Sequence, residues 1–184
     1  MEKRALVLLA QGCEELEAVT VIDLLRRANI QVTTAGLDPH VVVASRGVKL
    51  VPDTTLGEAL KHEYDMVVLP GGLPGADNLA NDPRVVDLVR RMAKAGAFTC
   101  AICAAPVVLA KAGVLAGRRA TSYPGCLDQL GLPDVTYTGE AVTRDGNVIT
   151  SRGPGTAMDF ALELIRALLD EETRRRVETS LVRS

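Results

Sequence analysis

Residues 98–106 have the sequence FTCAICAAP and pass from a buried strand into an apolar helix expected over residues 107–112. Cys103 falls at the turn between the two, among alanines whose small side chains permit the tight backbone of a nucleophile elbow. Such elbows often strain the φ/ψ angles of the nucleophile, and the N-terminus of the following helix favours a thiolate over a thiol. The pattern predicts a reactive Cys103 with a lowered pKa, although a buried structural cysteine explains the same residues equally well.

Apolar runs rich in β-branched residues predict parallel strands at residues 5–10, 31–35, 66–69 and 98–102. Helical patterns cover residues 15–28, 83–96 with Asp82 as N-cap, 157–169 and 171–181. Strands that are apolar on both faces need helices on both sides of the sheet. An Asp145-Gly146 pair predicts an antiparallel hairpin over residues 140–151. The sequence thus predicts a three-layer α/β sandwich with a mostly parallel sheet.

The composition is that of an ordinary globular domain. The 184 residues are 47% hydrophobic and hold no repeat or linker, which fits one domain over residues 1–184. A net charge of −2 and an aromatic content of 3% provide no basic or stacking surface for nucleic acid. The longest apolar run, residues 100–110, is too short to cross a bilayer, and no secretory signal is recognisable. Four cysteines in such a chain are typical of reduced thiols, so we expect a cytoplasmic protein without a membrane partner.

Two further segments place polar groups near the carboxyl ends of predicted strands. Gly71 and Gly72 follow the strand at residues 66–69, and glycines let backbone N–H groups approach a ligand closely. We expect these N–H groups, together with the N–H of Ala104, to stabilise an oxyanion. Glu17 lies on the apolar stripe of the first helix, so we expect a half-buried carboxyl with a raised pKa that suits proton exchange. Each segment also has a plainer explanation: an ordinary turn for the glycines and a capping or salt-bridging role for the glutamate.

Other kinds of site have less support in the sequence. Cys100 and Cys103 form a C-x-x-C, but Cys100 belongs to the strand, and positions three apart on a strand point to opposite faces, unlike those of a redox pair. No second C-x-x-C or nearby histidine completes a metal site, and no Gly-Lys-Ser or Gly-Lys-Thr is present to hold a phosphate. His40 and His62 fall in expected surface loops, which argues against a Cys-His dyad.

Four motifs, taken together, resemble those of the ThiJ/PfpI superfamily. They occur in the same order and at matching spacing along nearly the whole chain: Glu14-Glu15-Leu16-Glu17, Leu69-Pro70-Gly71-Gly72, Ala101-Ile102-Cys103-Ala104-Ala105-Pro106 and Ser151-Arg152-Gly153-Pro154-Gly155-Thr156. The branch that the chain resembles most is that of DJ-one and its bacterial YajL-type relatives. The resemblance implies a flavodoxin-like α/β sandwich with a mostly parallel sheet, a nucleophile elbow and a β-hairpin.

The resemblance also implies roles for individual residues. Cys103 becomes the reactive cysteine, Glu17 its protonated partner, and the N–H groups of Gly72 and Ala104 an anion-binding pair. The chain departs from several relatives at Tyr123, where they carry a histidine before a proline. Tyr123 therefore places a phenol at the third catalytic position, and we expect its side chain to lie on the substrate-binding side. The absence of the histidine argues against a peptidase activity that depends on a catalytic triad.

Two functions follow from the resemblance. The first is an enzyme without metal or cofactor that acts on reactive α-oxoaldehydes such as methylglyoxal, as a glutathione-independent glyoxalase or as a deglycase of glycated proteins, with Cys103 adding to the aldehyde and Glu17 moving protons. The second is an oxidative-stress sensor or redox-regulated chaperone in which Cys103 is oxidised to a sulfinate. Members of this branch are usually homodimers, so we expect a homodimer with residues 153–155 near the interface.

Overall fold

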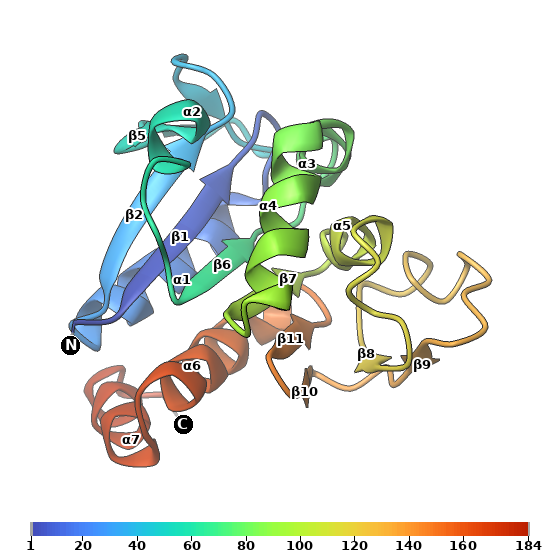
Figure 1. The fold of residues 1–184 in the computed structure, drawn as a ribbon. Coiled ribbons are helices and arrows are strands. Elements are labelled where there is room, and N and C mark those ends of the chain that lie inside the picture. Colours follow the sequence, from blue (N-terminus) through green and yellow to red (C-terminus); the bar gives the residue numbers. More distant parts are fainter. Residues whose placement is uncertain (1, 184) are drawn as a thin grey trace.

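The computed structural model describes residues 2–183 and has one central sheet with helices on both faces (Figure 1). Within that range the sheet has seven strands in the order β10-β11-β7-β6-β1-β2-β5. The β10 strand is antiparallel to β11, and the other neighbouring pairs are parallel, which confirms the mostly parallel sheet. The strands are β1 (Arg4–Leu9), β2 (Gln31–Gly36), β5 (Thr54–Thr55), β6 (Met66–Leu69), β7 (Phe98–Ile102), β10 (Val142–Asp145) and β11 (Val148–Ser151).

The side chains of each strand divide between two apolar layers, as the period of two along a strand requires. In β1, Val7 and Leu9 belong to one layer, and Leu6 and Leu8 belong to the other. The first layer includes side chains of α1 (Glu15–Arg27), α6 (Ala157–Leu168) and α7 (Glu171–Ser180). The second includes α2 (Leu56–Ala59), α3 (Gly75–Asn81), α4 (Pro83–Lys94) and α5 (Pro106–Lys111). Both faces of the sheet are therefore covered, and the predicted three-layer sandwich is confirmed.

The predicted helices agree with the structure to within a few residues where the sequence carries a cap. Asp82 caps α4, because its side chain accepts the N–H of Arg84 at 2.9 Å, and Pro83 is the first helical residue. Glu14 caps α1 in a similar way. Helix α3 was not predicted, since it follows Pro74, has no side-chain cap and is only seven residues long.

The predicted hairpin is present as β10 and β11, but its turn lies one residue later than the Asp145-Gly146 pair suggests. Asp145 pairs with Val148 in the ladder, so the two-residue loop consists of Gly146 and Asn147. Gly146 has a φ of 60°, and the side chain of Asp145 accepts the N–H of Arg119 at 2.9 Å. Glycine is favoured at the first loop position because positive φ values cost it little, and this backbone requirement sets the register.

Two small sheets lie outside the central one. Strand β3 (Val42–Val43) is antiparallel to β4 (Lys49–Leu50), and β8 (Arg119–Ala120) is parallel to β9 (Thr136–Tyr137). Figure 1 shows the segment with β8 and β9, in yellow and orange, beyond α5 at one end of the molecule. Among the helices of residues 2–183, none combines the length and the apolar character needed to cross a membrane.

Candidate active site

The carboxyl ends of β1, β6 and β7 meet at one edge of the sheet. Strand β1 pairs with β2 on one side and with β6 on the other, so the strand order reverses at β1. In open α/β sheets, the loops at such a reversal leave a crevice for ligands. Glu17 lies on the helix after β1, Gly71 follows β6, and Cys103 follows β7. The fold therefore brings together the three segments that the sequence predicted to carry chemistry.

Cys103 occupies the turn between β7 and α5 with a φ of 64°, which is uncommon for a residue with a side chain. Two backbone hydrogen bonds hold it: its N–H donates to the carbonyl of Ser151 at 3.0 Å, and its carbonyl accepts the N–H of Tyr123 at 2.8 Å. A backbone conformation of this kind costs about 1–3 kcal/mol and persists only where its surroundings enforce it. The predicted elbow is thus present, and Cys103 is 9% exposed.

Gly71 lies between the two groups that are expected to react. A Cβ atom built on Gly71 comes within 2.7 Å of the Cβ of Cys103, 2.7 Å of the carbonyl oxygen of Ile102 and 2.9 Å of Oε2 of Glu17, so only glycine fits. The N–H of Gly71 donates to Oε2 of Glu17 at 2.8 Å. This hydrogen bond corrects the sequence-based expectation that Gly71 helps to bind an oxyanion, because its N–H is already used. Gly71 instead positions Glu17.

Glu17 is fully buried on the face of α1 that also buries Ala18 and Val21, rather than half-buried as predicted. Burial raises the pKa of its carboxyl to about 7, while the hydrogen bond from Gly71 and the contact with the thiol of Cys103 lower it. Its second oxygen, Oε1, is buried and has no hydrogen-bond partner within the part of the chain that is described. Both protonation states of Glu17 are therefore populated near neutral pH, and one oxygen remains free to exchange a proton.

The surroundings of Cys103 contradict the prediction of a lowered pKa. Burial, followed by the negative charge of Glu17 and the hydrogen bond with it, raises the pKa of the thiol to about 12. The N–H groups of Gly72 and Ala104 donate to the sulfur and lower the pKa. The negative charge exists only in ionised Glu17, whereas protonated Glu17 becomes a donor that favours the thiolate. The prediction of an independently acidic thiol is wrong, and the two residues form a coupled pair instead.

Tyr123 stands beside the elbow and contacts Cys103 through its backbone. The residue is 52% exposed, and a Cβ built on Gly153 would lie 3.4 Å from Cδ2 of its ring. Together with Pro124 and residues 152–156, Tyr123 lines a cavity of about 390 Å³. The ring therefore borders an accessible space next to the reactive turn.

The carbonyl group of Ser151, which accepts the N–H of Cys103, was missing from the predicted site. Ser151 is fully buried, and its hydroxyl donates to the carbonyl of Ala141 at 2.7 Å and lies 2.7 Å from Oγ1 of Thr156. A serine at the end of a strand that begins with two β-branched apolar residues, Val148 and Ile149, is the sequence signal that points to such a position. These hydrogen bonds hold the end of β11 against the elbow.

The other cysteines and the histidines lie outside this cluster. All four thiols are free, and Cys100 packs in the same apolar cluster as Cys103. The prediction that these two residues point to opposite faces is wrong, because the positive φ of Cys103 interrupts the alternation of the strand. His40 and His62 are exposed, as predicted. Within residues 2–183 no three His, Cys, Asp or Glu side chains are grouped so as to hold a metal ion.

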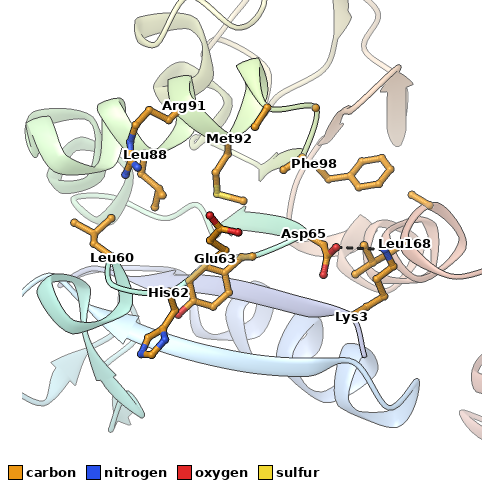
Figure 2. A pocket seen from close by; sticks show the side chains of 15 residues that line it. Lys3, Leu60, His62, Glu63, Asp65, Leu88, Arg91, Met92, Phe98 and Leu168 are labelled. Carbon is orange, nitrogen blue, oxygen red and sulfur yellow. Dashed lines mark hydrogen bonds and ion pairs between the residues drawn. The ribbon is translucent and has the colours of Figure 1, made fainter. Parts of the chain in front are cut away.

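A larger cavity, of about 600 Å³, lies at the opposite edge of the sheet (Figure 2). It is lined by Lys3, Asp65 and Phe98, at the amino ends of β1, β6 and β7, and by Met92 and Leu168 from the helices. Lys3 and Asp65 form an ion pair of 3.2 Å beside it. Since Cys103 follows the carboxyl end of β7, this cavity is separate from the candidate active site.

The sequence matches one family model over most of its length. The model of the DJ-1/PfpI family covers residues 3–167. The chain belongs to the DJ-1/PfpI family. The resemblance seen in the four sequence motifs is thereby confirmed.

Similar proteins within the family span the chain almost completely. Protein dj-1beta of Drosophila melanogaster is 46% identical over 184 residues, which is 99% of this chain and 98% of that protein. The crystal structure of Drosophila melanogaster DJ-1beta has a TM-score of 0.95 at 45% identity, with all of both chains covered, and confirms the flavodoxin-like fold. The "Glutathione-independent glyoxalase DJR-1.2" of Caenorhabditis elegans is 36% identical over 91% of this chain and 89% of that protein. A structure of oxidized DJ-1 from Toxoplasma gondii has a TM-score of 0.94 at 33% identity and 99% coverage of each chain.

Proposed function

We propose that this protein converts reactive α-oxoaldehydes such as methylglyoxal into α-hydroxy acids without glutathione, and removes early adducts of such aldehydes from proteins. The main support is the pair that Glu17 and Cys103 form across Gly71, in which a buried carboxyl with a pKa of about 7 lies beside a thiol. The reaction needs one nucleophile and one proton carrier. The glutathione-independent glyoxalase of Caenorhabditis elegans, at 36% identity, adds support from a relative.

The first step is addition of the thiol to the aldehyde. The sulfur of Cys103 bonds to the aldehyde carbon, the carbonyl π electrons move to oxygen, and ionised Glu17 takes the thiol proton and delivers it to that oxygen. The N–H groups of Gly72 and Ala104, which donate to the sulfur, stabilise negative charge as it moves. The product is a hemithioacetal, and Glu17 is again ionised.

Proton transfer between the two substrate carbons follows. Glu17 removes the proton from the hemithioacetal carbon and returns it to the neighbouring carbon, while the hydroxyl proton of the hemithioacetal passes to the carbonyl oxygen on that neighbouring carbon. The intermediate is an enediol, and the product is the thioester of an α-hydroxy acid on Cys103. Water hydrolyses the thioester, releases the α-hydroxy acid and restores the thiol. The sum of the steps is addition of one water to the α-oxoaldehyde. A carboxyl with a pKa of about 7 suits both the acid and the base role at neutral pH.

A second proposal uses the same cysteine as an oxidation sensor. Two molecules of hydrogen peroxide convert the thiol of Cys103 into a sulfinate and leave two molecules of water. The N–H groups of Gly72 and Ala104 and the proton on Glu17 are suitable donors for the sulfinate oxygens. The structure of oxidized Toxoplasma gondii DJ-1, at 33% identity, supports this proposal from a relative.

We further propose that the protein forms a homodimer through an apolar patch on α1 and α6. Leu16 and Val19 of α1 are 51% and 47% exposed, and Met158 near the start of α6 is 44% exposed. Leu16 and Met158 line one hollow together with Pro154 and Gly155, which belong to the segment expected near an interface. Exposed apolar side chains around a hollow are typical of a surface that pairs with another protein.

Lactate formation from methylglyoxal without glutathione tests the enzyme proposal. We expect lactate from the wild type, none above background from Cys103→Ser, and at least about 100-fold less from Glu17→Gln, since acid–base catalysis contributes about 10²–10⁴-fold. Cys126→Ser is the matched control, because Cys126 is a partly buried thiol outside the cluster. Lactate at the wild-type rate from Cys103→Ser would contradict the proposal. A wild type without turnover whose Cys103 is oxidised first by peroxide would favour the sensor.

A further inference from the structure

The cavity beside the elbow has two walls, residues 123–124 and residues 152–156, and a volume of about 390 Å³. The backbone of Cys103 is hydrogen-bonded to both sides of the cavity. Its carbonyl accepts the N–H of Tyr123 in the first wall at 2.8 Å, and its N–H donates at 3.0 Å to the carbonyl of Ser151, the residue before Arg152. Small-molecule sites have volumes of about 300–1,000 Å³. Cys103 itself does not line the cavity, so the cavity lies beside the reacting group and is suited to the part of a substrate that extends beyond the reacting carbonyl.

Arg152 gives this cavity its charge. The other residues that line the cavity carry no ionised side chain at neutral pH, so no carboxylate opposes the guanidinium there. Nη1 of Arg152 donates to the carbonyl of Gly139 at 3.0 Å, and the ion pairs within residues 2–183 do not include Arg152. A guanidinium has five N–H donors in a planar fork that fits a carboxylate. Most of these donors remain available to an anion that enters the cavity.

We infer that Arg152 makes the site selective for α-oxoaldehydes that carry a carboxylate at the end opposite the aldehyde. This inference rests on the proposed function and adds the class of substrate to it. The aldehyde carbon bonds to Cys103, the carbon chain lies between the ring of Tyr123 and residues 153–155, and the carboxylate binds the free N–H groups of Arg152. Methylglyoxal lacks the carboxylate, so the site recognises it only through its reacting end.

Two five-carbon substrates test the inference, because they differ only at the far end. The anionic substrate is 4,5-dioxovalerate, which gives 2-hydroxyglutarate, and the neutral one is 2-oxopentanal, which gives 2-hydroxypentanoate. We expect the wild type to prefer the anionic substrate in kcat/KM, and Arg152→Gln to lower this preference about tenfold or more, mainly through KM, since hydrogen bonds between charged groups are the strong ones. Arg152→Lys should retain part of the preference, and the control Arg90→Gln, an exposed arginine on α4 paired with Asp87, should retain all of it. An unchanged preference in Arg152→Gln would overturn the inference.

Alkylation of Cys103 separates this inference from the proposed function, because it requires no turnover. Anionic iodoacetate and neutral iodoacetamide differ in charge, and peptide mass spectrometry measures the rate of each at Cys103, with Arg90→Gln as the control variant. We expect the ratio of iodoacetate to iodoacetamide alkylation at Cys103 to fall severalfold in Arg152→Gln and to keep the wild-type value in Arg90→Gln. If the wild type turns over neither aldehyde but this ratio falls, the proposed function fails and the anion selectivity stands. An equal ratio in wild type and Arg152→Gln would refute the selectivity even in an active enzyme.

Discussion

The free energy of unfolding of the wild type is expected to fall as the pH rises, and Glu17→Gln is expected to abolish this fall. Glutamine keeps the size of the side chain, and its amide oxygen can accept the N–H of Gly71, which donates to Oε2 of Glu17 at 2.8 Å. Glutamine does not ionise. Any pH dependence that disappears on this substitution therefore comes from the carboxyl group of Glu17.

The magnitude follows from the pKa of Glu17, which burial raises from 4.5 to about 7 in the folded protein. The folded chain binds this proton more tightly than the unfolded chain does, so the free energy of unfolding falls as the pH rises through the window from 4.5 to about 7. The stabilisation is fully present below pH 4.5 and is lost above about pH 7. A difference of about 2.5 pKa units, at about 1.4 kcal/mol each, corresponds to about 3–4 kcal/mol.

Urea unfolding at pH 5 and pH 8 measures this effect. From the integrated linkage we expect the wild type to lose about 2–3 kcal/mol between the two conditions through Glu17, and Glu17→Gln to lack this loss. Glu15→Gln is a matched control on the same helix with the opposite sign. Although burial raises the pKa of Glu15, hydrogen bonds from its own N–H, from Ser45 and from Arg46 hold that pKa below its usual value, so its stabilisation is lost as the pH falls.

The result that would refute this reasoning is a wild type and a Glu17→Gln variant that lose the same free energy between pH 5 and pH 8. The carboxyl of Glu17 would then ionise in the folded protein without a penalty, and it would not share a proton with Cys103 at neutral pH. Glu15→Gln should keep the loss seen in the wild type over this range. If it does not, the loss comes from another group.

Three further predictions follow from the same geometry. Gly71→Ala is expected to lower the free energy of unfolding by about 1–3 kcal/mol and to reduce lactate formation, because the added methyl group meets the carbonyl of Ile102 at 2.7 Å. Chemical denaturation measures the free energy of unfolding, and a variant as stable as the wild type would contradict the close contact. Mild peroxide is expected to add about 32 Da to Cys103 before any other cysteine, including the partly buried Cys126. The thiol has a raised pKa, but the N–H groups of Gly72 and Ala104 and the proton on Glu17 can stabilise the sulfinate once it forms. Earlier oxidation of another cysteine, seen by peptide mass spectrometry, would count against this. Leu16→Glu is expected to convert the proposed dimer into a monomer near 19.5 kDa in light scattering, and a wild type of that mass at every micromolar concentration would disprove the dimer.

Much of the architecture could be derived from local chemistry in the sequence. The alternation of buried strands and amphipathic helices was sufficient for the three-layer sandwich, because each element shows its own periodicity within a few residues. Asp82 marked the start of α4 through a cap that involves only its immediate neighbours. The motifs around Glu17, Gly72 and Cys103 indicated the family and the candidate site, since they occur in a fixed order along the chain. The short helix α3 was not evident, because it has no side-chain cap. The Asp145-Gly146 pair indicated the hairpin but placed its turn one residue too early, because the pair alone does not show that Asp145 belongs to the ladder.

Only the tertiary structure decided how the site residues act on one another. The sequence placed Glu17 on an apolar stripe, but its complete burial depends on the segments that follow β6 and β7, where Gly71 and Cys103 contact its carboxyl group. Gly71 donates to a carboxylate 54 residues away in the chain, so its N–H is not available to a substrate. The pKa of Cys103 is raised rather than lowered, because burial and the charge of Glu17 outweigh the donors that its own turn provides. Burial and electrostatic coupling depend on which distant segments meet, and no local pattern encodes those distances.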